Sequence, residues 1–501
     1  MLRIRYLRLK ILYLLFIGLA GCLYYEAVSP YLGVLTWAAG AWSFCPWPFN
    51  RRVSETQGSA RYSTKKEIGK SFTGGGVIVG KYQGKLLRFD DAGHLVTFAP
   101  TRTGKGRGQI IPTLLTYEGS CFVTDIKREN YDITARQRRA LGQAVYAIDP
   151  NRPETSAIFN PLDYVRVDPQ HLGTDASTLA GLLVPRGNAG ASAHFDQQAY
   201  TVVKGLIMLV KTIYGVEKAH MGTVRALLCS GEEQQEEVWQ RMAASSHAEI
   251  AEIGNGIVAT EIRERSAILS TARGKTEIWS DNKIKTITSG ASSFDFHAMK
   301  EKPQTVYMVI PPEHLDTYKS FMRAVVGMAN LAMTQNTKRP KKPVLFLLDE
   351  FPALGHMAAF ETGIGVVAGY GVKYWLFCQD QAQLKAKYKD AWASMVGNCA
   401  VQSYFGVTDY ETAKRLSNSM GNQTVSYESV NASIEAGGLM ADDRGFSVSE
   451  RGRELMTPDE ITSMDYQEQI ILKQGMRPIR AQKAFYDQVK QFRGLYDTWE
   501  E

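Results

Sequence analysis

The sequence is poor in cysteine, and it has no internal repeat and no long acidic or basic tail. Its 6 cysteines include no C-x-x-C pair and no paired Cys/His spacing, which argues against a structural zinc site and a disulfide scaffold. Hydrophobic residues make up 44% and charged residues 22% of the 501 positions, so a disordered chain is excluded. We expect a reduced, cytosolic body of roughly two to four domains.

Charge is almost absent from residues 11–50, which carry only Glu26. Two apolar stretches, residues 11–25 and 31–49, approach the length of a membrane span. Basic residues flank the region on both sides: Arg3, Arg5, Arg8 and Lys10 before it, and Arg51 and Arg52 after it. Because basic flanks stay in the cytoplasm, the number of crossings should be even, and residues 1–50 are predicted to form a transmembrane hairpin. One longer tilted span with a surface segment is an alternative.

A lipoprotein signal is a second alternative for the same region. A basic start, an apolar run and the sequence Leu19-Ala-Gly-Cys22 would suit cleavage before Cys22 and its lipidation. That interpretation exports the rest of the chain away from ATP, and the motifs described next argue against it.

The net charge of +7 lies in this N-terminal part of the chain. Residues 1–70 hold 10 basic and 3 acidic side chains, so residues 71–501 sum to zero. The charge therefore marks a membrane flank and does not by itself indicate a body that binds nucleic acid.

A strand, a glycine-rich loop and a helix follow one another at residues 94–116. The loop is Thr101-Arg-Thr-Gly-Lys-Gly-Arg-Gly108. Successive backbone N–H groups at a helix N-terminus can surround phosphate oxygens, and a lysine adds charge at the β/γ end. Ala99 replaces the first glycine of the usual P-loop, and Gly106 replaces the Ser/Thr that holds Mg²⁺, so an ordinary glycine-rich turn is the alternative. The predicted phosphate-binding residues are Thr101, Arg102, Thr103, Gly104, Lys105, Gly106 and Arg107.

Two carboxylates follow a second buried strand. Residues 343–348 form a continuous apolar run, typical of a strand buried on both faces of a parallel sheet, and Asp349 and Glu350 come directly after it. We predict that Asp349 binds Mg²⁺ through water and that Glu350 orients the attacking water. Gln379 ends the strand at residues 374–378, where it could touch the γ-phosphate; a solvated strand end is the alternative. Lys105, Asp349, Glu350 and Gln379 are the predicted catalytic residues.

Further apolar strands at residues 121–124, 144–148, 305–310 and 401–405 also end in polar side chains or prolines. Polar residues gathered after apolar strands mark the active edge of an open α/β sheet. The predicted fold class is α/β, with a RecA-like P-loop NTPase core.

These motifs resemble those of the type IV secretion coupling proteins, the TraG/TraD family of membrane-anchored ATPases. The resemblance covers nearly the whole chain. Its other motifs include Gly58-Ser-Ala-Arg61, Asp125-Ile-Lys127 with Glu129, Phe159-Asn-Pro-Leu-Asp163, Leu348-Asp-Glu-Phe-Pro352 and Met456-Thr-Pro-Asp-Glu460. Gly106 is typical of this family, so the hydroxyl that would serve Mg²⁺ is unassigned between Thr101 and Thr103. Arg128 departs from the small residue expected after Asp-x-Lys.

The resemblance implies a homo-hexameric ATPase at the bacterial inner membrane that uses ATP and Mg²⁺. Such proteins receive a relaxase with its single-stranded DNA, or an effector protein, and pass it to a type IV secretion channel. Conjugative DNA transfer is the commoner use. The bulk of the chain would then lie in the cytoplasm. A nucleotide-gated membrane receptor with little turnover and a chromosome-type DNA translocase are the competing functions.

In the middle of the chain, helical patterns replace the strand patterns. Residues 198–214 and 232–244 have helical patterns, and strand-forming sequence resumes near residues 284–289. We therefore divide the chain into a hairpin (1–50), the nucleotide-binding domain (51–165 and 285–501) and an inserted all-α domain (166–284). The insertion holds 12 basic and 14 acidic side chains, which suits protein docking better than nonspecific DNA binding; a solvated cap is the alternative.

Flexible loops are expected at residues 187–193 and 430–451, which are rich in small and polar residues. Arg415, Arg451 and Arg453 are candidates for an arginine that reaches a neighbouring subunit's nucleotide, with Arg415 and Arg453 preferred. Surface arginines without a role are the alternative.

Overall fold

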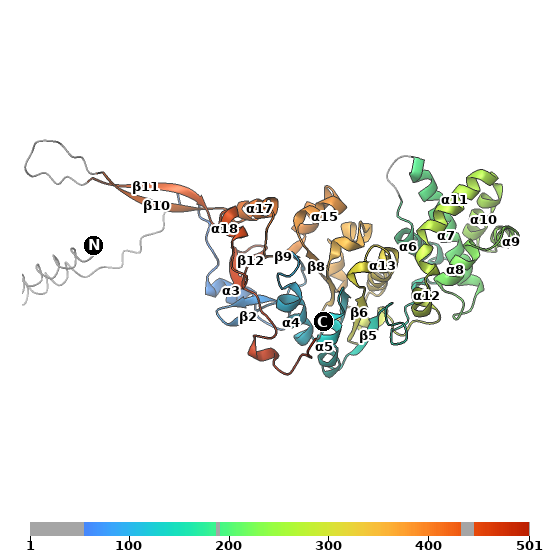
Figure 1. Ribbon diagram of the computed structural model, residues 1–501, viewed down its shortest axis with the longest axis horizontal. Helices are drawn as coiled ribbons and strands as arrows, with labels where there is room; N and C mark the ends of the chain where they lie inside the picture. Colours follow the sequence, from blue (N-terminus) through green and yellow to red (C-terminus); the bar gives the residue numbers. More distant parts are fainter. Residues whose placement is uncertain (1–54, 187–190, 432–444, 500–501) are drawn as a thin grey trace, which may run out of the picture. The chain divides into compact units, whose positions relative to one another are not determined.

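The computed structural model describes residues 55–186, 191–431 and 445–499 (Figure 1). One unit, Gly58–Val425 with Gly452–Glu501, contains the large sheet and the helices, and a second unit includes Ser426–Arg451. The predicted hairpin at residues 1–50 and the lipidation site at Cys22 lie outside the described residues. No helix in the described ranges combines the length and the apolar character needed to cross a bilayer.

A mixed sheet of eleven strands forms the centre of the larger unit. Its spatial order is β2-β1-β13-β12-β9-β3-β8-β7-β4-β6-β5. The strands from β9 to β5 run parallel, whereas β2, β1, β13 and β12 pair antiparallel and extend the sheet beyond β9. The strands are β1 (Val77–Tyr82), β2 (Lys85–Phe89), β3 (His94–Phe98), β4 (Cys121–Asp125), β5 (Ala144–Ile148), β6 (Gln304–Val309), β7 (Val344–Leu348), β8 (Val372–Cys378), β9 (Cys399–Tyr404), β12 (Glu468–Lys473) and β13 (Ile479–Gln482).

Strands β7 and β8, in the middle of the parallel part, are buried on both faces, as their unbroken apolar sequences predict. Along β7, Phe346 and Leu348 face one hydrophobic core, which also contains helix α13 (Lys319–Gln335). Leu345 and Leu347 face the other core, which contains Leu114 of helix α4 (Ile111–Thr116). Because side chains alternate along a strand, one apolar run supplies both layers. The α/β fold with a strand–loop–helix unit is confirmed.

The other helices of the larger unit connect or cover the strands. They are α3 (Lys65–Ser71), η1 (Gly106–Ile110), α5 (Glu129–Ala140), η5 (Pro312–His314), η6 (Phe351–Leu354), α14 (Ala358–Gly363), η7 (Val367–Tyr370), α15 (Gln381–Tyr388), α16 (Ala391–Gly397), α17 (Tyr410–Met420), α18 (Pro458–Thr462) and η8 (Lys490–Phe492).

Helices fill the sequence between β5 and β6, where they appear in green to yellow in Figure 1. They are η2 (Pro161–Tyr164), α6 (Leu172–Leu183), α7 (Ala191–Ile213), α8 (Met221–Leu228), α9 (Glu232–Ala243), α10 (Ala248–Ala259), α11 (Ile262–Lys275), η3 (Glu277–Ser280), α12 (Asn282–Thr288) and η4 (His297–Lys300). The helices predicted at residues 198–214 and 232–244 correspond to α7 and α9.

The strand predicted near residues 284–289 is wrong, because this segment is helix α12. The side chain of Asp281 accepts the N–H groups of Lys283 and Ile284 and so begins the helix. Ile284 and Ile287, three residues apart, then bury their side chains in the core. The β-branched composition favoured a strand, but the cap and the packing favour the helix.

The described parts of the two predicted loops belong to regular elements. The flanks of the second one belong to strands β10 (Asn422–Asn431) and β11 (Gly445–Glu454), which pair in a two-stranded sheet. Residues 191–193 of the first one belong to α7. Residues 187–190 and 432–444 lie outside the described residues.

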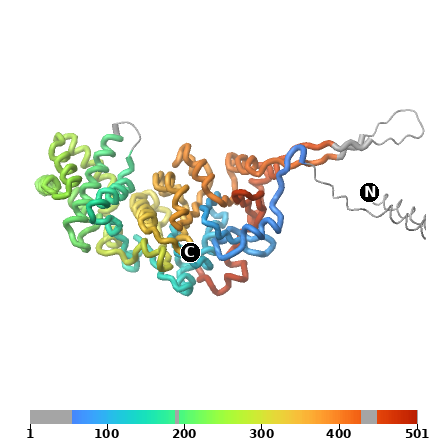
Figure 2. Tube along the Cα trace, turned by 180° about the vertical axis from the view of Figure 1, so that it is seen from behind, coloured from blue at the N-terminus to red at the C-terminus, as the bar shows by residue number. Residues whose placement is uncertain are grey.

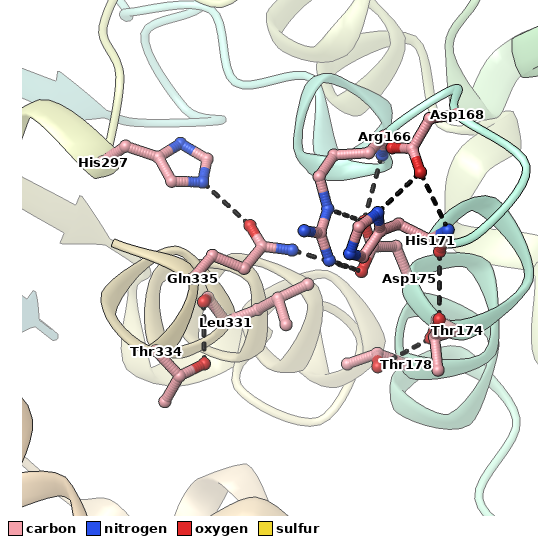
Figure 3. Close-up of polar contacts among 10 residues, drawn as sticks. All are labelled: Arg166, Asp168, His171, Thr174, Asp175, Thr178, His297, Leu331, Thr334 and Gln335. Carbon is pink, nitrogen blue, oxygen red and sulfur yellow. Dashed lines mark hydrogen bonds and ion pairs between the residues drawn. The ribbon is translucent and has the colours of Figure 1, made fainter. Parts of the chain in front are cut away.

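A polar network joins α6 to α13 and η4 (Figure 3). The carboxylate of Asp175 accepts three hydrogen bonds from Arg166, at 2.7, 2.9 and 3.1 Å, and one from the amide nitrogen of Gln335 at 3.2 Å. The amide oxygen of Gln335 lies 2.8 Å from Nε2 of His297, whose Nδ1 lies 2.9 Å from Asp295. Helix α6 is thus fastened to the core by charge-assisted hydrogen bonds.

The His297–Asp295 pair should make the stability of this junction depend on pH. The hydrogen bond that His297 donates to Asp295 raises the pKa of His297, and the same bond lowers the pKa of Asp295. The contribution of His297 is full below its unfolded pKa of about 6.5 and is lost as pH rises through the folded value. The contribution of Asp295 is full above about 3.8 and is lost as pH falls. The pair therefore stabilises the fold most between these limits.

We expect His297→Asn to lower the thermal midpoint at pH 5.5 and to have a smaller effect at pH 8. The difference between wild type and variant, measured by circular dichroism over this range, checks it. Asp295→Asn is the matched control, since it should remove the same pH-dependent part. An equal loss at both pH values would contradict a role for the ionised pair.

Candidate nucleotide-binding site

The glycine-rich loop follows β3 at the carboxyl edge of the parallel sheet. The N–H of Ala99 still bonds to the carbonyl of Cys378 on β8, at 2.9 Å, so the loop begins in register with the sheet. Arg102 (φ 62°) and Gly104 (φ 90°) adopt left-handed backbone conformations that turn the chain. A Cβ on Gly104 would come within 3.0 Å of the Phe485 ring, so this position also needs the space that glycine leaves.

A helix begins directly after Lys105, earlier than the predicted residue 109. Its first turn, η1, is a π-helix that starts at Gly106 and continues into α4. The hydroxyl of Thr103 donates to the carbonyl of Pro100 at 2.6 Å, and Thr103 does not line the cleft described below, whereas Thr101 does. Of the two hydroxyls considered for Mg²⁺, only that of Thr101 is therefore at the cleft surface.

Asp349 and Glu350 follow β7 at the same edge of the sheet. The hydroxyl of Thr124 on β4 donates to the carbonyl of Asp349 at 2.9 Å. The N–H of Glu350 donates to Oδ1 of Asp349 at 3.1 Å. Glu350 itself has φ 51°, a left-handed conformation that is costly for a non-glycine residue. This turn directs the two consecutive carboxylates into the cleft.

Glu350 lies between the loop lysine and the predicted glutamine. Its Oε2 is 3.5 Å from Nζ of Lys105, and its Oε1 accepts the side-chain N–H of Gln379 at 3.0 Å. The side chains of Lys105 and Glu350 are only 11% and 15% exposed. Lys105, Glu350 and Gln379, which follow strands β3, β7 and β8, therefore lie together, as the sequence predicted.

Burial governs the protonation of the acids here. It raises the pKa of Asp349 and of Glu350, and the charge of Lys105 opposes the shift in both cases. Burial also raises the pKa of Asp125, at the end of β4, to about 7, although the backbone N–H groups of Tyr131 and Asn130 oppose it. Burial thus disfavours the charged form of all three carboxylates.

A cleft of about 1190 Å³ opens over this edge of the sheet. The sequence-predicted residues that line it are Thr101, Arg102, Gly104, Lys105, Gly106, Arg107, Asp349, Glu350 and Gln379. Asp125, Asn130, Lys319, Lys387 and Tyr466 line it as well, and they were not among the predicted site residues. Asp125 could have been found, because it directly follows a buried strand.

The candidate arginines lie elsewhere. Arg415, on α17, stacks on the ring of Trp392 at 4.3 Å, and Arg453 pairs with Glu460 at 2.5 Å. Arg451 belongs to the second unit. None of the three lines the cleft.

Residues 483–487, near the C-terminal end of the chain, contact the glycine-rich loop, and the sequence did not predict these contacts. The C-terminal part of the chain, in dark red in Figure 2, runs beside the blue and cyan part of the tube. Nζ of Lys483 donates to the carbonyl of Thr103 at 2.5 Å, and the N–H of Tyr486 donates to the carbonyl of Arg107 at 3.1 Å. The guanidinium of Arg107 lies 4.4 Å above the Phe485 ring and pairs with Asp487 at 2.5 Å. The loop is therefore fixed from the C-terminal side of the chain.

The contacts of Arg128 explain how an arginine fits where the sequence comparison of motifs led us to expect a small residue. Arg128 has φ 63°, a conformation that a small residue adopts more easily, and it precedes α5. Its guanidinium pairs with Asp149 at 2.5 Å and with Asp132 at 3.1 Å, and it lies 4.5 Å from the Tyr131 ring. These contacts compensate the backbone strain and neutralise the buried carboxylate of Asp149 at the end of β5.

The fold and the site define a P-loop NTPase fold. The solved structures that it resembles include the conjugative coupling protein TrwBdeltaN70 in an unbound form, with a TM-score of 0.65 at 14% identity, covering 85% of this chain and 94% of that one. TrwB in complex with the ATP analogue ADPNP gives a TM-score of 0.65 at 13% identity, covering 88% of this chain and 97% of that one. At these identities the likeness shows the fold.

Sequence comparison identifies the family. The family model described as "Type IV secretory system Conjugative DNA transfer" matches residues 53–494. The conjugal transfer protein TraG of Escherichia coli is 30% identical over 454 residues, covering 81% of this chain and 71% of the relative. Protein VirD4 of Agrobacterium fabrum is 28% identical over 423 residues, covering 83% of this chain and 62% of the relative. The chain belongs to the family of conjugative DNA transfer proteins of type IV secretory systems, as its motifs indicated.

Proposed function

We propose that this protein is the coupling ATPase of a conjugative DNA transfer system, located at the bacterial inner membrane. It recruits relaxase–DNA or protein substrates and uses ATP hydrolysis to deliver them to a type IV secretion channel. The observation that carries the ATPase part is the contact of Glu350 with both Lys105 and Gln379 at the mouth of the loop. Family membership carries the transfer part.

The residues divide the chemistry among them. The N–H groups from Gly104 to Arg107 hold the phosphates, and Lys105 moves from Glu350 to the β- and γ-phosphates. Glu350, freed from the lysine, polarises the attacking water, while Gln379 holds its other oxygen. Because this ion pair is nearly enclosed, it keeps the base inactive until a nucleotide competes for the lysine.

Mg²⁺ fits the site in the manner usual for nucleotide enzymes. This ion prefers one or two carboxylates together with waters and phosphate oxygens. Asp349 supplies a buried carboxylate whose raised pKa would return toward its ordinary value beside a dication. No group of three or more acidic, His or Cys residues suited to a metal occurs in the part of the chain that the structure describes. Such a site depends on the nucleotide for its remaining ligands.

The receptor with little turnover is the competing proposal, and the irregular loop favours it. Ala99 lacks the flexibility of the glycine that usually begins a P-loop, and Gly106 lacks the hydroxyl that usually holds Mg²⁺. The ATPase proposal rests instead on the contacts that Glu350 makes with Lys105 and Gln379.

Binding of ATP by the purified full-length chain tests the loop. We expect Lys105→Ala to weaken ATP binding by roughly 10- to 100-fold, because a charged hydrogen bond to phosphate is lost. Isothermal titration calorimetry measures this, and Lys338→Ala, which removes an exposed lysine paired with Glu301, is the control. Equal affinities of wild type and Lys105→Ala would overturn the proposed site.

The remaining assignments, which come from the sequence pattern or from the family, stay proposals. They are a homo-hexamer, single-stranded DNA as a partner, two membrane crossings within residues 1–50, and the division at residues 51–165, 166–284 and 285–501. Arg415 and Arg453 are the candidates for the arginine acting in trans. Each would have to exchange its partner, Trp392 or Glu460, for a neighbouring subunit's phosphate.

A further inference from the structure

Tyr466 is a large aromatic side chain left exposed at the edge of the nucleotide cleft. It is 51% exposed and lines the same cleft as Lys105 and Glu350. It lies between α18 and β12, far from the loop in sequence. Exposed aromatic side chains are common, but one that lines a cleft beside a phosphate-binding loop offers a flat apolar surface to a ligand.

The ring of Tyr466 is held in place by its neighbours. Nζ of Lys483 lies 3.9 Å from its centroid, and the Phe485 ring stacks against it at 5.7 Å with an interplanar angle of 30°. The same lysine bonds to the carbonyl of Thr103. A ring held by a cation–π contact and by stacking is pre-organised, so a ligand that packs on it loses little conformational freedom.

The position of this ring relative to the loop indicates which part of a nucleotide it meets. Lys105 reaches toward Glu350, which marks the β/γ-phosphate end. Phe485 approaches Gly104 and Gly108, and it carries the guanidinium of Arg107 on its ring. The hydroxyl of Tyr466 would lie 3.3 Å from a Cβ on Gly104, so the ring borders the loop itself. A nucleoside placed on this side of the loop would meet the ring.

We propose that Tyr466, supported by Phe485 and Lys483, is the surface on which the base of the bound nucleotide stacks. This inference rests on the proposed nucleotide site and adds the residue that binds its base. Stacking on an aromatic ring is tolerant of base identity, because every base has a π-face. The site should therefore take nucleoside triphosphates with little dependence on the base.

The test compares ATP with inorganic tripolyphosphate, which carries the phosphates without a base. Both are titrated into the purified full-length chain by calorimetry. We expect Tyr466→Ala to weaken ATP binding by roughly 5- to 100-fold and to leave tripolyphosphate binding unchanged. Tyr466→Phe should keep wild-type affinity for both, since the ring is retained. Tyr410→Ala, which removes an exposed tyrosine on α17, is the matched control.

The outcomes separate the two proposals. Loss of tripolyphosphate binding in Lys105→Ala, with unchanged ATP affinity in Tyr466→Ala, would overturn the stacking surface and leave the phosphate site standing. Failure of the wild type to bind either ligand would refute the phosphate site itself. An equal loss of both ligands in Tyr466→Ala would show that the side chain only supports the loop, and this also overturns the inference.

Discussion

Glu350→Gln is expected to lower the turnover of ATP by about 10²- to 10⁴-fold and to leave ATP binding intact or slightly tighter. A glutamine keeps the shape of the side chain and an oxygen that can accept the N–H of Gln379. It loses the negative charge that activates water. It also loses the ion pair with Lys105, so the lysine is free for phosphate before the nucleotide arrives.

Steady-state hydrolysis and equilibrium binding on the same preparations measure both parts of this prediction. Glu361→Gln is the matched control, because Glu361 pairs with His356 on the protein surface and lies outside the cleft. Turnover within twofold of wild type would reject Glu350 as the base. If the wild type bound ATP but hydrolysed it no faster than the variant, the receptor function would be favoured over the motor.

Arg138→Met is expected to destabilise the region around the loop helix by about 3–5 kcal/mol, the range for removing a network that satisfies several buried groups. Arg138 lies on α5 and is fully buried. It donates to the carbonyls of Leu114, Tyr117 and Gly119 and to the side chains of Thr305 and Gln143. Its cation thus lies at the C-terminal end of α4, where the helix dipole favours positive charge.

Methionine would fill much of the apolar volume but satisfy none of these carbonyls. Hydrogen exchange of the amides of α4 and β4 measures the local free energy of opening, which suits a chain of this size better than global unfolding. Arg139→Met is the control, since Arg139 is exposed and contacts only the hydroxyl of Tyr131 by hydrogen bonding. A change below about 0.5 kcal/mol, the range of surface substitutions, would contradict the role given to Arg138.

The carboxyl-edge site was predictable because each part has a local signature. Lys105 sits in a glycine-rich loop after a strand, and Asp349, Glu350 and Gln379 come directly after apolar runs. Parallel strands bring their carboxyl ends to one edge, so the assembly followed from the order of these signals. The strand predicted near residues 284–289 was wrong because the composition of this segment suits either a strand or a helix. The helix cap at Asp281 and the packing of Ile284 and Ile287 in the core favour the helix.

The sequence alone determined the fold class and the family, and it marked the glycine-rich loop and the two carboxylates after β7 as the candidate site, because strand periodicity and loop chemistry act over a few residues. Only the tertiary structure shows that Tyr466, Lys483 and Phe485 lie at the loop and that Arg138 lies at the C-terminal end of α4. Those contacts join residues separated by tens to hundreds of positions, and their side chains carry no local signal of the partner they meet. Burial then raises the pKa of Asp125, Asp349 and Glu350, and the charge of Lys105 opposes the shift for Asp349 and Glu350.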